Sequence, residues 1–177
     1  MPSLDITLAR GTASEERVRD WLLDLTRQSD LDRWIFCRRV VIDEGATVNQ
    51  ARLREGQPEI LLWTGLRGPV GLLALLIHEQ LHVHLAHCTE GVDAAVEELQ
   101  LHYPTVPVGG EEGAQSERST YEHLLLCRLE QDALAGLLDA EILARLKPRG
   151  YRFIYREVTR NADFLRDVIR RHGLTVA

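Results

Sequence analysis

The chain has 177 residues, of which 45% are hydrophobic and 27% charged, with a net charge of −6. This length suits one domain with a full hydrophobic core, and the composition excludes a low-complexity or fibrous chain. The longest apolar run, from Pro69 to Ile77, is shorter than the roughly 20 residues that a membrane span needs. We therefore expect a globular protein without a membrane partner.

The cysteines indicate a reducing compartment. Cys37, Cys88 and Cys127 are odd in number, far apart and without a Cys-x-x-Cys pair, which favours free thiols over a disulfide framework. The segment from Met1 to Asp5 lacks the basic and apolar regions that begin a signal peptide. We expect a cytoplasmic protein.

Charge is uneven along the chain. Up to Leu146 there are 13 Lys and Arg against 24 Asp and Glu, whereas from Lys147 onward there are 8 against 3. A basic C-terminal segment could contact nucleic acid. Its charges, however, have helical spacing on an amphipathic segment, which favours a solvated face that packs on an acidic body. We do not expect nucleic acid as a partner.

The first third of the chain predicts one helix and a small sheet. Thr12 to Glu15 is a capping box, and apolar residues at helical spacing continue the helix to about Gln28. Segments rich in β-branched and aromatic residues predict strands at 34–42, 47–53 and 59–63. Because tight turns separate these segments, the expected sheet is three-stranded and mostly antiparallel.

The rest of the chain predicts helices. We expect a helix from Leu66 to about His87 and a short one over 90–101, followed by a long loop from Tyr103 to Gly113 that is either a lid or a mobile connection. A long helix over 116–146, kinked or broken near Gly136, ends at Pro148 and Gly150, and residues 151–171 give one or two helices. The predicted class is α+β, as one domain over 1–177: helix and sheet in 1–65, a helix in 66–88 and a helical part in 89–177.

A His-Glu-x-x-His motif, His78 to His82, lies inside the predicted helix 66–87. Helical residues four apart lie on the same face, so His78 and His82 would present two imidazoles to one point, with Glu79 one step round the helix. Two imidazoles and a nearby carboxylate are the parts of a zinc hydrolase site. The alternative is two buried histidines with Glu79 as their hydrogen-bonding partner.

With its apolar lead, this motif resembles the zincin superfamily of metallopeptidases over about 20 residues. The resemblance implies zinc as cofactor, His78 and His82 as its ligands, Glu79 as the base that activates water, and a peptide or protein substrate. The predicted order of helix, small sheet and motif helix agrees with the upper half of a zincin fold. The chain lacks the Asn-Glu-x-x-Ser-Asp signature of thermolysin-like enzymes, so it resembles a minimal gluzincin-like domain.

The sequence does not single out one residue as the third zinc ligand. The metzincin pattern does not fit, because Cys88 stands where that subclass has histidine and Leu85 where it has glycine. In gluzincins the third ligand is a Glu on a later helix. Glu122 shares a stripe with apolar residues at positions 125, 126, 129 and 133, which makes it the first candidate and Glu117 the second. The remaining alternatives are Glu97, Glu130 and His87.

The sequence therefore predicts a zinc metallopeptidase in which Glu79 passes the proton of the attacking water to the leaving amine. Tyr121, His123 and Tyr103 are candidates for oxyanion or substrate contacts. The strand 59–63, if it is an exposed edge, could pair with an extended peptide that Trp63 and Arg67 also contact. The alternatives are a catalytically inactive, zincin-like metal-binding protein with a regulatory or interaction role, and a structural protein with an accidental motif.

Overall fold

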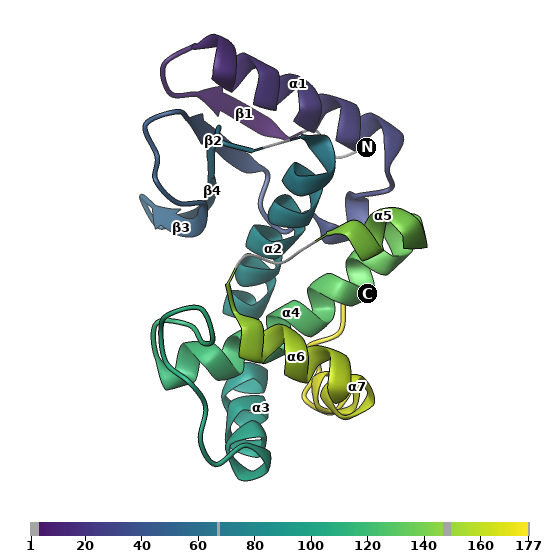
Figure 1. Ribbon diagram of the computed structural model, residues 1–177. Helices are drawn as coiled ribbons and strands as arrows, with labels where there is room; N and C mark the ends of the chain where they lie inside the picture. Colours follow the sequence, from purple (N-terminus) through teal and green to yellow (C-terminus); the bar gives the residue numbers. More distant parts are fainter. Residues whose placement is uncertain (1–3, 67, 147–149, 177) are drawn as a thin grey trace. The chain divides into compact units, whose positions relative to one another are not determined.

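The computed structural model describes residues 4–66, 68–146 and 150–176, so Arg67 and Pro148 lie outside the described residues. The protein is α+β, as predicted (Figure 1). Its elements in chain order are β1 (Asp5–Leu8), α1 (Ala13–Gln28), a 3-10 turn (Asp32–Trp34), β2 (Arg39–Asp43), β3 (Gln50–Arg54), β4 (Gln57–Trp63), α2 (Pro69–His87), α3 (Thr89–His102), α4 (Glu117–Leu137), α5 (Ala140–Arg145), α6 (Arg152–Arg160) and α7 (Ala162–Arg171).

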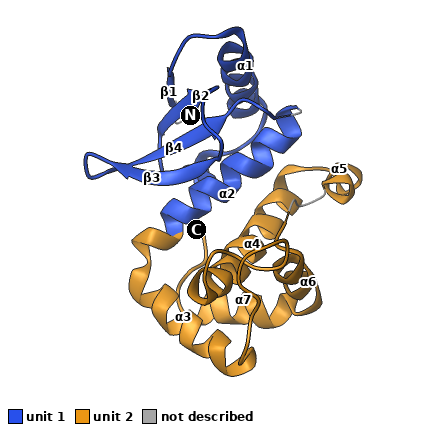
Figure 2. Cartoon of the chain, turned by 60° about the vertical axis from the view of Figure 1, so that its left-hand side comes forward, with its two compact units in different colours: residues 1–84 blue, residues 85–177 orange. Residues whose placement is uncertain are grey.

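The chain divides into two compact units, residues 1–84 and 85–177 (Figure 2). The division falls inside α2, which runs unbroken from Pro69 to His87. The first unit contains the sheet, α1 and most of α2, whereas every regular element described in the second unit is helical. The prediction of a helical C-terminal half is therefore confirmed.

In the described part of the first unit, the sheet has four strands in the order β1-β2-β4-β3, one more than predicted. Two of its pairs, β1–β2 and β2–β4, are parallel and only β3–β4 is antiparallel, so the expectation of a mostly antiparallel sheet is wrong. The missed strand β1 is four residues long and lies at the edge of the sheet, so it carries little of the pattern that identifies a strand. The helix α1 supplies the long crossover that parallel neighbours require.

The predicted strand 34–42 is shorter in the structure. β2 covers only Arg39–Asp43, and Trp34 ends the preceding 3-10 turn. The main-chain N–H groups of Phe36 and Cys37 donate to the side chain of Gln80, and residues 35–38 lie outside the sheet. An apolar, β-branched sequence therefore does not continue as a strand where its amides have another acceptor.

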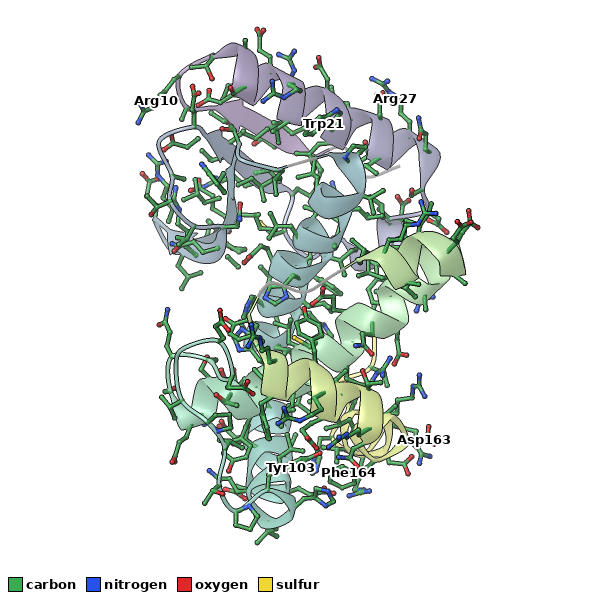
Figure 3. The ribbon with its side chains drawn as sticks, in the orientation of Figure 1. Arg10, Trp21, Arg27, Tyr103, Asp163 and Phe164 are labelled. Atoms are coloured by element: carbon green, nitrogen blue, oxygen red, sulfur yellow. The ribbon has the colours of Figure 1, made fainter. Side chains whose placement is uncertain are left out.

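The capping box at the start of α1 is confirmed. The hydroxyl of Thr12 accepts a hydrogen bond from the N–H of Glu15 at 3.3 Å, and the Glu15 carboxylate accepts from the N–H groups of Arg10 and Gly11 at 2.9 and 2.8 Å. The first bond satisfies an amide of the first helical turn that has no partner within the helix, and the other two hold the segment before α1 to the helix start. Figure 3 shows Arg10 and Arg27 at opposite ends of α1, which packs against β1 and β2.

The second unit is built around α4, which packs against α3, α5, α6 and α7. The predicted long helix is two helices, because Leu138 is extended at φ −125° and ψ 147°, two residues after Gly136. The last helical segment is also two helices, α6 and α7, which meet at Asn161. The apolar interior consists of residues from all the long helices: Val92, Val96, Leu99, Leu124, Leu125, Leu126, Ile154, Val158, Leu165, Val168 and Ile169.

The long loop between α3 and α4 is hydrogen-bonded both to α4 and to the start of α6. The hydroxyl of Thr120 donates to the carbonyl of Pro107 at 3.0 Å and accepts from the N–H of Ala114 at 2.9 Å. The carbonyls of Glu111 and Glu112 accept from the first two N–H groups of α6, at 2.8 and 3.2 Å. The loop therefore caps α6, a structural role that its proline and glycine content did not indicate.

Arginines of the basic C-terminal segment pair with acidic side chains of their own unit. Arg166 lies 2.8 Å from Asp132, and Arg171 pairs with Glu98. These pairs agree with the interpretation of this segment as a face that packs on acidic residues. No helix among the described residues is both long and apolar enough to cross a membrane.

Candidate metal centre

The His-Glu-x-x-His motif lies in the middle of α2. The ring centroids of His78 and His82 are 5.0 Å apart, with their planes at 75°, and both side chains are half-buried. The four-residue spacing places both rings on one face of an unbroken helix, as predicted. The two imidazoles are thus disposed to serve one ligand.

Gln80 fixes the rotation of α2 about its own axis. Its Oε1 accepts from the N–H groups of Phe36 and Cys37 at 2.8 and 2.7 Å, and its Nε2 donates to the carbonyl of Cys37 at 2.7 Å. The side chain is 0% exposed. At about 100° per residue, Gln80 faces nearly opposite to the mean direction of His78 and His82. Anchoring Gln80 therefore sets the direction of the two rings within the first unit.

The carboxylate of Glu79 is held by the sheet. Its Oε2 accepts a hydrogen bond from the main-chain N–H of Ala51 in β3 at 2.7 Å, and the residue is only 4% exposed. A buried carboxylate requires such donors, because desolvation of an unpaired charge is costly. The proposed base is thus attached to the edge of the sheet.

Glu122, the first candidate for the third ligand, lies at the margin of the buried stripe of α4. Leu125, Leu126 and Leu129 of that stripe are buried, as predicted. The Glu122 side chain is 35% exposed, and its carboxylate accepts from Arg118 at 2.8 Å. The role of Glu122 as a metal ligand stays a prediction.

His123, the next residue, is oriented by its own helix. The residue is 7% exposed, and its Nδ1 lies 2.7 Å from the carbonyl of Ser119. That contact favours the tautomer with the proton on Nδ1, so that Nε2 carries the lone pair. The ring of Tyr151 packs beside it, with centroids 4.7 Å apart. His123 therefore has the fixed orientation that is typical of metal-binding histidines.

Cys127 and Glu130 continue this face of α4, four and seven residues after His123. Both are buried, and the hydroxyl of Tyr155 in α6 donates to the Glu130 carboxylate at 3.2 Å. Burial raises the pKa of the Cys127 thiol well above its ordinary value. Burial also raises the pKa of the Tyr155 hydroxyl, and the neighbouring Cys127 and Glu130 raise it further. The sequence predicted Cys127 only as a free thiol, although the spacing 123, 127 and 130 places these three residues on one helix face.

The other candidates have identifiable surroundings. Glu117 and Glu97 are exposed, and His87 is exposed in the last turn of α2. The hydroxyl of Tyr121 donates to the carbonyl of Tyr103 at 2.6 Å, and the hydroxyl of Tyr103 accepts from Asn161 at 2.9 Å. These bonds serve the fold of the second unit, and catalytic roles for the two tyrosines stay predictions.

The predicted peptide-docking strand is not an edge. β4 lies between β2 and β3, so its main-chain groups are used on both sides. The prediction that the strand over 59–63 pairs with a peptide is therefore wrong. The outer strand next to it is β3, to which Glu79 is bonded.

Within the described residues, the side chains suited to hold a metal ion are His78 and His82 on α2 and, in the second unit, His123, Cys127 and Glu130 on α4. Imidazole nitrogen, thiolate sulfur and carboxylate oxygen are the donors that zinc prefers in proteins, so the residue types fit this ion. Comparisons with protein-family models, with curated proteins and with solved structures give no match.

Proposed function

We propose that the chain is a zinc-dependent metallopeptidase of the zincin type, in which His78 and His82 bind the metal and Glu79 is the general base. The observation that carries the proposal is the pair of imidazoles 5.0 Å apart on one face of α2. The buried carboxylate of Glu79 follows directly on the first of them. This combination is the one that a metal-assisted hydrolysis requires. The three free cysteines support a cytoplasmic location for this activity.

In gluzincins, the subclass that the motif resembles, a later helix supplies the third ligand, and on α4 His123 is the residue best oriented for this role. Its Nδ1 is held by the carbonyl of Ser119, which directs the metal-binding lone pair to Nε2. Glu122, favoured by the sequence pattern, is the first alternative, although Arg118 competes for its carboxylate. Glu130 is the second alternative, with Tyr155 as the group that would orient it.

Bound zinc would supply Lewis acidity, which lowers the pKa of a coordinated water towards neutrality and polarises a carbonyl. Glu79 then accepts the proton of the attacking water and delivers it to the nitrogen of the leaving amine. Its burial keeps competing water away from the carboxylate. The atoms balance as ordinary hydrolysis: one peptide bond and one water give a carboxylate and a protonated amine.

A peptide substrate would add to β3 in extended form. β3 is an outer strand of the described sheet, and main-chain groups at a sheet edge pair with extended chains without a sequence requirement. Leu53 in this strand is largely exposed and offers an apolar contact. The bond from Ala51 to Glu79 places the base beside the same strand.

The test is cleavage of a broad peptide library by the zinc-loaded protein, followed by mass spectrometry. Glu79→Gln should retain zinc and lose hydrolysis, whereas Glu16→Gln, on the exposed side of α1, should retain both. Stoichiometric zinc without cleavage of any peptide would refute the peptidase and favour the inactive, zincin-like metal-binding protein with a regulatory role.

The ligand from α4 is decided by zinc affinity. His123→Ala should weaken zinc binding by at least about 10-fold, which is the lower end of what loss of a metal-site residue costs. Glu122→Ala and Glu130→Ala should leave it within about 2-fold of the wild type. A loss confined to one of the glutamates would move the third ligand to that residue.

A further inference from the structure

The N–H of Ala51 points away from the sheet. In the antiparallel pair β3–β4, Ala51 lies opposite Ile60 and Leu53 lies opposite Pro58. Pro58 has no N–H, so Leu53 and Pro58 cannot exchange the two main-chain hydrogen bonds of a hydrogen-bonded pair. Hydrogen-bonded and non-hydrogen-bonded pairs alternate along antiparallel strands. Ala51 is two residues from Leu53, so its pair with Ile60 is also of the non-hydrogen-bonded kind. Its N–H therefore faces the outer side of β3, where it donates to Glu79.

Glu79 and Gln80, two of the three residues between the motif histidines, hold α2 to the rest of the first unit from two directions. Gln80 bonds to the segment that precedes β2, and Glu79 bonds to β3. The two side chains leave the helix about 100° apart. The first fixes the helix, and the second fixes the carboxylate itself.

We propose that the main-chain N–H of Ala51 orients the Glu79 carboxylate for proton transfer, which makes Ala51 a positioning residue. This inference rests on the proposed function, because orientation matters only if Glu79 is the base. Since the donor is a backbone group, the side chain at position 51 is unimportant, and no side-chain motif reveals this role in the sequence. A general base is effective only when its oxygen lies within hydrogen-bond reach of the proton it takes.

The decisive variant is Ala51→Pro. Proline removes this one N–H, and it is tolerated on edge strands where the N–H faces outward. Leu53→Pro is the matched control, because it removes an N–H of a non-hydrogen-bonded pair on the same strand. Ala51→Gly keeps the N–H and controls for the side chain.

In Ala51→Pro we expect kcat for peptide hydrolysis to fall by about 10- to 100-fold, the range found when an orienting hydrogen bond is lost at a metal site. In Ala51→Pro, KM and the zinc content should not change. Leu53→Pro removes a main-chain group of the proposed peptide-binding edge, so it should raise KM but keep kcat within about 3-fold of the wild type. Ala51→Gly should keep both kcat and KM within about 3-fold. A purely structural role would instead change KM, zinc content and stability together. Unchanged kcat in Ala51→Pro, or an equal loss in Leu53→Pro, would overturn the inference.

Amide hydrogen exchange separates this inference from the proposed function, because it needs no substrate. In the metal-free protein the Ala51 amide should exchange more slowly than the Leu53 amide, and this protection should disappear in Glu79→Ala. Protection that persists in Glu79→Ala refutes the contact with Glu79. Failure of the wild-type protein to cleave any peptide refutes the proposed function instead.

Discussion

Replacement of Gln80 by alanine should destabilise the first unit strongly. The change removes three hydrogen bonds of 2.7 to 2.8 Å, to the N–H groups of Phe36 and Cys37 and to the carbonyl of Cys37. Phe36 is half-buried, so water can replace its partner, but Cys37 is buried. Two buried polar groups left without partners, at about 1–3 kcal/mol each, predict a loss of about 2–6 kcal/mol.

Tryptophan fluorescence in urea suits this measurement, because Trp21, Trp34 and Trp63 all lie in residues 1–84. With a slope of about 2 kcal/mol per molar urea, the midpoint should fall by at least about 1 M. Gln28→Ala, at the exposed end of α1, is the matched control and should shift it by less than about 0.3 M. Equal midpoints for the two variants would refute the view that Gln80 fixes α2.

Two further predictions concern the second unit. Arg128, only 5% exposed, donates to Asp132 and to the carbonyl of Val158. Arg128→Ala should therefore lower the free energy of unfolding, measured in a circular-dichroism melt, by about 2–4 kcal/mol. A loss under about 0.5 kcal/mol, which is typical of an exposed ion pair, would contradict this. Hydrogen bonds from His172 and Arg171 lower the pKa of Glu98, so their stabilisation should be complete above the pKa of an unfolded Glu and disappear as pH falls through the lowered folded pKa. The difference in unfolding free energy between wild type and Glu98→Gln should therefore shrink in acid, and a difference that grows as pH falls would contradict the assignment.

The sequence predicted best what depends on local pattern. The start of α1 at Thr12 and its end at Gln28 follow from a capping box and apolar spacing, which act within a few residues. The helix that carries His78 and His82 follows from an apolar run without an internal break. The relation between the two rings then follows from helix geometry alone.

What the sequence missed depends on contacts that are distant in the chain. β1 is too short to show a pattern, and the parallel pairing of β2 with β4 cannot be read from the turns between successive strands. Residues 35–38 look like a strand, but the amides of Phe36 and Cys37 bond to Gln80, more than 40 positions away. The interior position of β4 is a property of the whole sheet.

The candidate site divides in the same way. His78, Glu79 and His82 were identified by spacing, whereas the contact of Ala51 with Glu79 involves a backbone group that no sequence pattern marks. Glu122 was selected for its apolar neighbours on α4, but Arg118, one turn earlier, engages its carboxylate. The sequence predicted His123 only as an oxyanion or substrate contact, because the bond from its Nδ1 to the Ser119 carbonyl becomes visible only in the structure.

Zinc content after equilibrium dialysis tests the central claim most directly. The wild-type protein should retain about one zinc per chain, as a single tetrahedral site requires, and His78→Ala and His82→Ala should each lose it. His84→Ala is the matched control, because His84 lies on the same helix and its ring packs against Phe36 at 4.7 Å; this variant should retain the metal. A wild-type protein that stays metal-free in excess zinc, or variants of His78 and His82 that bind as much as the wild type, would contradict the account.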